Sequence, residues 1–414
     1  MKVVIAVCTL VLAGLGADAR AQEHQHADMQ MNGSSWQFMQ DGVGFLMFNH
    51  QGSSRGGTEL RAPNWWMLMA ERGVPHKGTF RVNLMVSADP ATVTSQGYRE
   101  ILQVGETYQD KALIDHQHPH DFLMQAAAVY TVPVANGYRL TFAGGPIAEP
   151  ALGPVAFMHR ASAAENPVAP LGHHTLDSTH VAMGVLTAAA GKGPVQVESS
   201  VFNAREPDEH RWDLMDPGPL DSWSVRGWYR PSPSIAAQVS YGYLTTPEAL
   251  EEGDVKRTTA SLSWQRNGLA MTAAWGHNQK IGGGYHAFLF EATRARPAYS
   301  LYSRLERTQV ETDVLRTGVH VFQGGRKNAH VVEPGRRDFV EAFTIGATRT
   351  LTRTKGWDFA AGADVTANVL PPSLTPFYGS SPVSAHVFLR VRPPAKHRMT
   401  EMTMTNVEAP MSMR

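Results

Sequence analysis

Residues 383–392 read Val-Ser-Ala-His-Val-Phe-Leu-Arg-Val-Arg, and apolar side chains alternate there with mostly polar ones. The apolar positions are Val383, Ala385, Val387, Leu389 and Val391, and those between them are Ser384, His386, Phe388, Arg390 and Arg392. Successive side chains of a β-strand point to opposite faces of the sheet, so this spacing gives one aliphatic face and one largely polar face. The stretch predicts a β-strand with an apolar environment on one side and a wet one on the other.

The same two-residue period recurs in residues 235–243, 258–265 and 357–366, and no convincing stretch of helical period competes with it. Short turn-forming links alternate with long connections, which cover about residues 88–121, 144–177, 205–220, 246–255, 278–285, 309–338 and 370–382. A transmembrane barrel requires this alternation, because its periplasmic turns are short and its outer loops are long. We expect an all-β protein, a single antiparallel transmembrane β-barrel of about 16 strands (14–18) over residues 36–392, with long extracellular loops, some folded into the lumen.

Tryptophan and tyrosine residues gather near the expected strand ends, as in the aromatic girdles of membrane barrels. They are Trp65, Trp66, Trp223, Trp228, Tyr241, Tyr243, Trp264, Trp275, Tyr299, Tyr302 and Trp357. Ordinary core packing is the alternative interpretation of the same residues.

The two ends of the chain have no strand pattern. Lys2, the apolar run after it and an Ala-x-Ala site predict a secretory signal peptide over residues 1–21. Residues 22–35 contain His and Met, lack a core pattern and are expected to be disordered. Residues 393–414 form a Met-rich polar tail. Thioether and imidazole together favour copper, although solvated tails without a ligand explain both segments as well.

The composition limits the partners. Lys+Arg and Asp+Glu both total 37, so no basic excess exists to neutralise phosphates, and we expect no nucleic acid partner. The single cysteine, Cys8, lies in the expected signal peptide, so the mature chain is expected to have no disulfide. An exported barrel predicts a location in the outer membrane, with membrane lipid and lipopolysaccharide as partners; the basic residues of 324–327 and 335–337 suit lipopolysaccharide phosphates.

The long connection over about residues 88–121 contains the motif Asp-His-Gln-His-Pro-His-Asp at residues 115–121. Pro119 favours an extended backbone at the preceding residue, and side chains two apart in an extended chain share a face. We expect His116, His118 and His120 on one face and Asp115, Gln117 and Asp121 on the other. Imidazole suits Zn, Cu, Ni and Fe, and the flanking aspartates would orient the rings. Alternatively, these histidines bond only to nearby backbone and water.

The segment after this motif, residues 122–132, reads as a strand, with a short helix as the alternative. Phe122, Met124, Ala126, Ala128 and Tyr130 alternate there with Leu123, Gln125 and Thr131. The strand interpretation therefore puts Met124 and Gln125 on opposite faces.

The long connection over about residues 144–177 is rich in proline and, with the residues just after it, in side chains that bind metals. These are Glu149, His159, Glu165, His173, His174, Asp177 and His180. The prolines would stiffen a segment that folds back into the barrel mouth, although His173 and His174 also fit a solvated turn. Asp177, Ser178 and His180 are too close along one strand to form a good catalytic triad. The full set of predicted metal ligands is Asp115, His116, His118, His120, Asp121, His159, His173, His174, Asp177 and His180.

The long connection that covers about residues 205–220 begins with alternating charges over residues 203–213. Such a pattern is typical of a loop held by salt bridges. The alternative is an acidic wall that faces the histidines and concentrates cations in the lumen.

Four loop motifs carry a resemblance to known proteins. They are LIDHQHPHD at residues 113–121, GGPIAEP at 144–150, FMHR at 157–160 and LGHHTLDSTH at 171–180. With the strand pattern and the signal peptide, they resemble an uncharacterised family of Gram-negative, porin-like outer-membrane β-barrels over nearly the whole mature chain. A looser likeness, limited to the tails and the architecture, is to copper-resistance outer-membrane barrels. Outer-membrane barrels usually end on an aromatic residue, and this chain departs from them because a polar tail follows Arg392.

These observations give three hypotheses. The first is a porin-like channel, or a pore that handles a transition metal ion, with a lumen lined by His and carboxylates; copper is favoured, and zinc or nickel are alternatives. The second is a structural or general porin for small solutes, in which the same residues only stiffen a loop. The third is a surface barrel enzyme acting on lipid or polysaccharide, although no nucleophile elbow or zincin motif is present. We favour a protein that is not an enzyme.

Overall fold

The computed structural model describes residues 35–74, 77–214, 218–249, 253–281, 283–317, 335–394 and 404. All of them belong to one compact unit, residues 32–407. The expected signal peptide and nearly all of the two expected tails lie outside the described residues.

Most described residues form one large antiparallel sheet. Its segments are β1 (Gln37–Gln51), β2 (Gly57–Arg61), β3 (Asn64–Val74), β4 (Gly78–Val86), β7 (Leu123–Pro133), β8 (Tyr138–Ala148), β9 (Ala182–Lys192), β10 (Val195–Asn203), β11 (Ser222–Ser232), β12 (Ile235–Leu244), β13 (Val255–Arg266), β14 (Leu269–Lys280), β15 (Gly283–Ala295), β16 (Tyr299–Glu311), β17 (Arg337–Thr354), β18 (Trp357–Val369) and β19 (Val383–Arg392). A separate hairpin consists of β5 (Tyr98–Tyr108) and β6 (Lys111–Gln117).

Helices are few and short. The α-helices are α2 (Asp89–Thr92), α3 (His173–Leu176), α4 (Thr312–Thr317) and α5 (Thr375–Tyr378), and the 3-10 helices are η1 (Ala135–Gly137), η2 (Phe157–His159) and η3 (Ser178–His180). In the described part of the chain, no helix is both long and apolar enough to cross a membrane.

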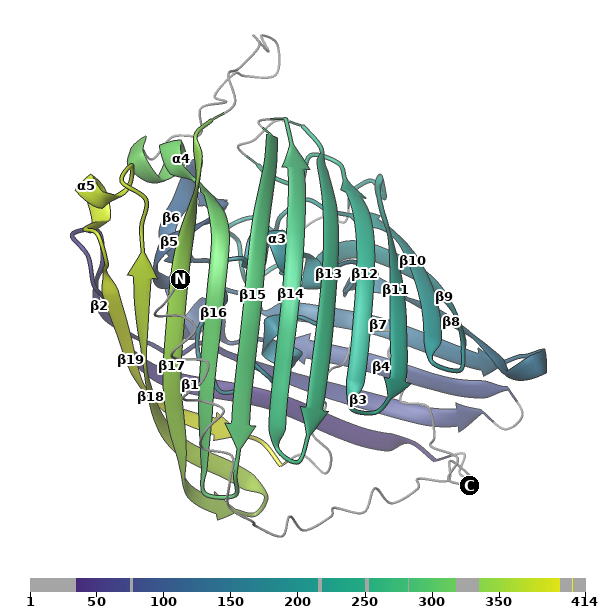
Figure 1. Cartoon of the computed structure of the whole chain (residues 1–414). Helices are drawn as coiled ribbons and strands as arrows, with labels where there is room; N and C mark the ends of the chain where they lie inside the picture. The colour runs from purple at the N-terminus through teal and green to yellow at the C-terminus, as the bar shows by residue number, and fades with distance from the viewer. Residues whose placement is uncertain are drawn as a thin grey trace. The chain divides into compact units, whose positions relative to one another are not determined.

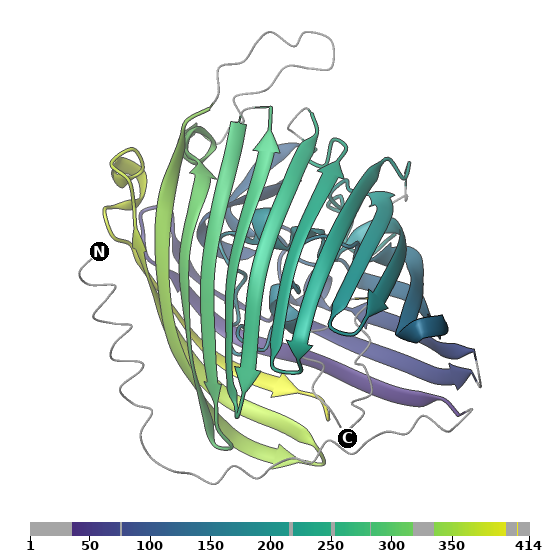
Figure 2. The same cartoon turned by 45° about the vertical axis from the view of Figure 1, so that its right-hand side comes forward.

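The large sheet closes on itself, because β1 pairs with β19 on one side and with β2 and β3 on the other. β2 and β3 continue each other along the same edge of β1, interrupted at Ala62 and Pro63, where the Phe45 N–H donates to the Pro63 carbonyl at 3.0 Å. Counted as one strand, they make the structure a closed barrel of 16 antiparallel strands (Figures 1 and 2). The predicted fold class and strand number are confirmed.

The two faces of the strands follow the predicted alternation. In β19, Val387 and Leu389 are 60% and 52% exposed, whereas Ser384 and Arg390 are 2% and 4% exposed. An apolar outer wall with a polar interior is the arrangement that a lipid bilayer selects.

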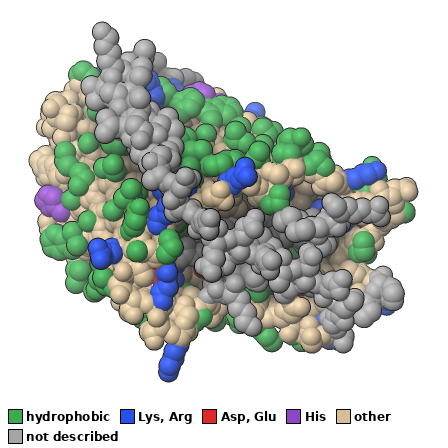
Figure 3. Space-filling view, turned by 60° about the horizontal axis from the view of Figure 1, so that its bottom comes forward, with side chains coloured by type: hydrophobic (Ala, Val, Ile, Leu, Met, Phe, Trp, Pro, Cys, Tyr) green, Lys and Arg blue, Asp and Glu red, His purple; other side chains and the backbone are tan. Residues whose placement is uncertain are grey.

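The connections also follow the prediction, with one exception. Short turns such as that between β17 and β18 lie at the bottom of Figure 1, and the long connections with α4 and α5 lie at the top. Figure 3 looks at the turn end, where Lys and Arg side chains are spread among hydrophobic and uncharged ones. The expected long connection 278–285 is wrong, because the pairing of β14 with β15 continues to Lys280 and Gly283 and leaves only a tight turn.

The aromatic girdle is confirmed for part of the predicted set. Trp66, Trp223, Tyr241, Tyr299 and Trp357 are exposed on the outer wall. Trp65, Trp228 and Tyr302 are instead buried, at 8%, 4% and 4% exposure, because the alternation of their strands turns them inward.

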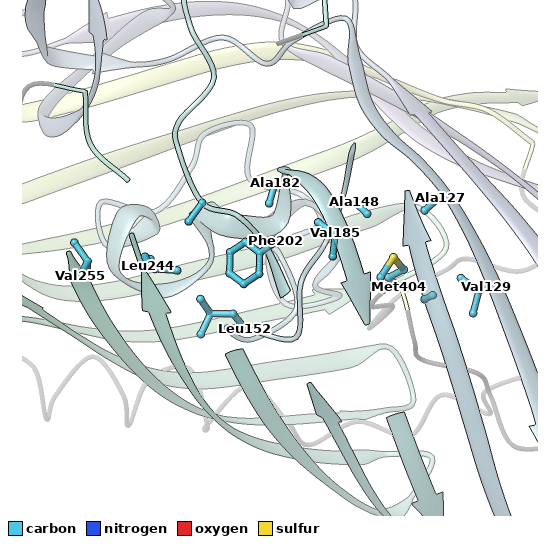
Figure 4. Packing of buried hydrophobic residues seen from close by; sticks show 12 residues of the cluster. Ala127, Val129, Ala148, Leu152, Ala182, Val185, Phe202, Leu244, Val255 and Met404 are labelled. Atoms are coloured by element: carbon cyan, nitrogen blue, oxygen red, sulfur yellow. The ribbon is translucent and has the colours of Figure 1, made fainter. Parts of the chain in front are cut away.

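The interior of the barrel is filled by connections that fold inward. Leu152 of the β8–β9 connection packs against Phe202 of β10 and Leu244 of β12 in one apolar cluster, which also includes Met404 (Figure 4). The inward side chain of Arg226 on β11 donates to the Gly153 carbonyl, and that of Arg304 on β16 donates to the Val168 carbonyl. Because inward side chains of separate strands hold it, the β8–β9 connection lies inside the barrel.

The β5–β6 hairpin lies inside as well. Asn49 on the inner face of β1 donates to the Arg99 carbonyl at 2.8 Å, and the Ile101 N–H donates to Gln51 at 3.2 Å. On the other side, Ile101 and Leu102 pack with Val310 of β16. The two inward connections thereby bring residues 98–121 and 149–181 together inside the barrel.

Candidate functional site

Five imidazoles from the two inward connections meet inside the barrel. His118 and His120 follow β6, whereas His173, His174 and His180 belong to α3 and η3. The distances between ring centroids are 6.2 Å for His118–His120, 6.0 Å for His120–His180, 5.4 Å for His180–His173, 6.0 Å for His173–His118, and 5.4 Å from His174 to both His118 and His173. Four rings thus form a closed circuit, with His174 beside it; we call these five residues the histidine cluster.

Acceptors outside the cluster hold the Nδ1 atoms of four of these rings. The Nδ1 atom of His118 lies 3.0 Å from Glu106, that of His120 lies 3.0 Å from Asp89, and that of His173 lies 2.7 Å from Asp177. The Nδ1 atom of His180 lies 2.8 Å from the backbone carbonyl of Asp177. An acceptor at Nδ1 keeps the proton on that nitrogen and leaves the Nε2 lone pair free.

The Nε2 atoms of the cluster lack such partners. Those of His120, His173, His174 and His180 are buried and have no hydrogen-bond partner among the described residues. A buried polar atom without a partner costs about 1–3 kcal/mol, so these four lone pairs are available to a water molecule or an ion.

Burial keeps three of the five rings neutral. It lowers the pKa of His173 to about 4 and those of His174 and His180 to about 3; for His173, the charge of Asp177 opposes this effect only in part. Neutral imidazole is the form that binds a metal ion. These three rings are therefore ready to act as ligands at neutral pH.

Two buried carboxylates beside the cluster stay charged. Burial alone would raise the pKa of Asp177, but the positive charge of Arg160 and the hydrogen bond from His173 hold it below its usual range. For Glu106, Arg211 and His118 outweigh burial in the same way, and its pKa is also lowered. The charged carboxylates match the groups that orient histidine ligands in metal sites.

The spacing of the rings is slightly wider than a metal ion needs. Tetrahedral histidine ligands with metal–nitrogen distances of about 2.0–2.1 Å place their ring centroids about 5 Å apart. The centroids here are 5.4–6.2 Å apart. Consistent with this, no group of three or more His, Cys, Asp or Glu among the described residues is arranged to hold a metal ion as the side chains stand. Binding would require the rings to move closer together.

The structure separates the predicted ligands into groups. Seven of the ten lie in or next to the cluster: His118, His120, Asp121, His173, His174, Asp177 and His180. Asp121 contacts Arg211 at 3.1 Å, and burial raises its pKa to about 6 despite that charge.

The other three predicted ligands lie elsewhere. His159 stacks edge-on against Trp65 at 4.7 Å, and burial lowers its pKa to about 4. The ring of His116 bonds to the Ile114 carbonyl, and Asp115 pairs with Arg55 at 2.7 Å. The shared face expected for His116, His118 and His120 is not formed, because β6 ends at Gln117 and the next residues leave the strand.

The pattern of the sequence missed two carboxylates. Asp89 and Glu106 stand before the histidine motif, in α2 and β5, and neither is in a run of ligand types. The Glu106 carboxylate contacts both His118 and Arg211, and Arg211 belongs to the β10–β11 connection. The distance from the Arg211 guanidinium to Glu106 is 2.5 Å. Arg211 therefore forms salt bridges of the kind that we predicted for the loop of residues 203–213. Glu206 of the same loop lies 3.8 Å from Nδ1 of His174.

Two solved structures of porins are similar to this chain. The anion-selective porin from Comamonas acidovorans is 9% identical, with a TM-score of 0.51 over 86% of this chain and 100% of its own. OmpF of Salmonella typhi, solved in complex with daunomycin, is 10% identical, with a TM-score of 0.50 over 85% of this chain and 97% of its own. The chain has the porin fold. No protein-family model matches the sequence, and no curated protein matches it either.

The likeness confirms the predicted porin-like architecture, and at such low identity it concerns the fold alone. The porin fold with its apolar outer wall agrees with the predicted place in the outer membrane.

Proposed function

We propose that this porin-like outer-membrane barrel binds a transition metal ion inside its lumen, through imidazoles of the histidine cluster. Neutral imidazole nitrogen suits copper, zinc and nickel. Copper is the favoured ion because the two ends of the sequence combine Met with His, and zinc and nickel are the alternatives. The proposal depends above all on one observation: four buried Nε2 atoms of neighbouring rings have no partner among the described residues.

The surroundings of the rings support a metal more than packing alone. Each of His118, His120 and His173 has a carboxylate at Nδ1. Metal-bound histidines almost always donate their second ring nitrogen to such an acceptor, which fixes the tautomer and raises the basicity of the ligand. A structural histidine has no need to keep Nε2 buried and unbonded.

The test is a metal titration of the purified, detergent-folded barrel after treatment with a chelator. Isothermal titration with Cu(II), Zn(II) and Ni(II) would compare the wild type with the triple variant His118→Ala, His173→Ala, His180→Ala. We expect the wild type to bind about one ion per chain and the triple variant to lose at least about 100-fold in affinity. Heat-modifiable gel migration would confirm that each variant is folded.

A matched control removes two histidines from the outer wall. His277 of β14 and His286 of β15 are stacked with ring centroids 4.4 Å apart, and the adjacent positions Asn278 and Ala287 face inward. The double variant His277→Ala, His286→Ala should bind metal as the wild type does. Equal binding by the wild type and the triple cluster variant would remove the metal proposal.

A second candidate is a barrel that binds no metal, in which the same residues stiffen the inward connections. It is favoured by the buried ion pairs that already hold these segments, such as Arg160 with Glu291 at 2.9 Å. On this alternative, the cluster variants lower heat stability or change conductance while the metal content stays at zero.

A further inference from the structure

A group of methionines lies on the inner wall close to the histidines. Met67 and Met69 of β3, Met85 of β4 and Met124 of β7 are buried together with Trp65, and Met39 and Met158 pack against them. We call these six methionines the methionine cluster. Met69, Met85 and Met124 are 1%, 2% and 0% exposed, so their thioethers are shielded from solvent.

On the same strands, methionines lie on the inner face and branched aliphatic side chains lie on the outer face. The branched side chains of Val82 and Leu84 point to the outer wall, at 40% and 37% exposure, while Met85 points inward. On β3, Met67 and Met69 are buried on either side of the half-buried Leu68. Filling space would be served by any aliphatic side chain, so the placement of thioethers inside and branched aliphatics outside suggests a role for sulfur.

The two clusters meet at the β8–β9 connection. Met158 of the methionine cluster precedes His159 in η2, and the His159 ring lies 4.7 Å from Trp65. Val181, which also packs against the methionines, directly follows His180 of the histidine cluster. The β8–β9 connection therefore contacts both groups of donors, at η2 and again just after η3.

We propose that the methionine cluster is a second metal site that takes a soft monovalent cation, Cu(I), beside the imidazole site. Thioether sulfur is a soft ligand that selects Cu(I) over harder divalent ions. A neutral thioether has no proton to lose, and a single positive charge is the smallest one to bring into an apolar wall. The inference deepens the proposed function, since it names copper as the ion, but the thioether site does not require the imidazole site to exist.

The experiment uses the whole folded barrel and two probes. Ag(I) reports on the thioether site as a redox-inert analogue of Cu(I), and Zn(II) reports on the imidazole site. The variant is Met67→Leu, Met69→Leu, Met85→Leu, because leucine is close to methionine in volume and such exchanges are tolerated best. Met47→Leu is the matched control, since Met47 is fully buried on β1 but packs in a different cluster with Phe45 and Phe388.

We expect the triple leucine variant to lose about tenfold or more in Ag(I) affinity and to keep its Zn(II) affinity. Met47→Leu should change neither. Unchanged Ag(I) binding in the triple variant would show that the methionines only pack, and would overturn the inference. If the triple variant does not fold, the single variants Met69→Leu and Met124→Leu serve the same comparison.

The two proposals fail in different ways. The imidazole site predicts that the histidine triple variant loses Zn(II) binding. If that variant binds Zn(II) as the wild type does, the imidazole site is wrong and the thioether site is unaffected. Retained Ag(I) binding in that histidine variant supports a separate thioether site, and complete loss of Ag(I) there would place the ion on the histidines and overturn the inference.

Discussion

The Asp177 carboxylate lies 2.7 Å from Nδ1 of His173, and the two side chains are 1% and 0% exposed. The second oxygen of the same carboxylate pairs with Arg160 at 2.5 Å, and Arg160 pairs in turn with Glu291 of β15. Asp177 is therefore the link that ties His173 of the histidine cluster to the barrel wall.

The change Asp177→Asn should weaken metal binding without removing a ligand. The amide keeps the shape but loses the charge that orients His173 and balances Arg160, so we expect the metal affinity to fall about 10–100-fold. Isothermal titration against the wild type measures the change. Glu149→Gln is the control: it lies in the same connection, pairs with Arg226 at 3.1 Å, and burial raises its pKa to about 7, so a neutral side chain there disturbs little. Equal losses in both variants would contradict a specific role for Asp177.

Gly105→Ala should displace one imidazole. A Cβ atom added at Gly105 would lie 2.2 Å from both Cε1 and Nε2 of His174, so the ring must move. We expect a measurable loss of metal affinity if His174 is a ligand, with the barrel still folded by gel migration. Gly227→Ala on β11 is the control, because nothing lies within 4 Å of an added Cβ atom there. An affinity in Gly105→Ala equal to that of Gly227→Ala would take His174 out of the site.

The metal-free barrel should lose stability as the pH falls from about 6.5 to about 4. Unfolded histidines titrate near pH 6.5, whereas burial lowers the pKa values of His159 and His173 to about 4 and those of His174 and His180 to about 3. In this window the unfolded chain binds more protons than the folded one, so each ring removes up to about 1.4 kcal/mol of stability per pH unit. Asp121 and Glu149, with pKa values raised to about 6 and about 7, oppose the trend in part.

The midpoint temperature of heat-modifiable gel migration, taken from pH 8 to pH 4, measures this effect. The triple cluster variant should show a shallower fall than the wild type, because it lacks His173 and His180, whose pKa values burial lowers. A profile that stays flat down to pH 4 in the wild type would mean that the rings are not held neutral.

The barrel was predictable because a two-residue period is a local property of the sequence. The alternation alone places Val387 on the outer face and Ser384 on the inner face, without reference to any partner strand. The pairing of His118 with His173 was not predictable, since they belong to different connections and meet only when both fold inward. The sequence indicated the cluster only through the high number of histidines in two loops. The same criterion also selected His116, which lies outside the cluster.

Irregular backbone hid two further features. The register between β4 and β7 shifts between Met85 and Val86, so Met124 and Gln125 are both buried, although simple alternation puts them on opposite faces. Asp115 has a positive φ of 57°, a conformation that strand patterning does not foresee, and its side chain turns to Tyr378. Long-range contacts and single backbone irregularities thus determine the side-chain positions that local periodicity does not predict.

Shortening the β5–β6 hairpin should raise the conductance of the barrel. The hairpin lies inside the barrel, bonded to β1 and packed against β16, and Arg55 anchors it through Asp115 at 2.7 Å. Arg99 pairs with His116 across the base of the hairpin, so an Asn-Gly turn can replace residues 100–115 and rejoin the strands. We expect single-channel recordings in planar bilayers to show larger steps for this variant than for the wild type. Arg55→Ala, which loosens the hairpin but keeps it, should give brief openings to the larger level; identical conductance in all three proteins would mean that the hairpin does not obstruct the path.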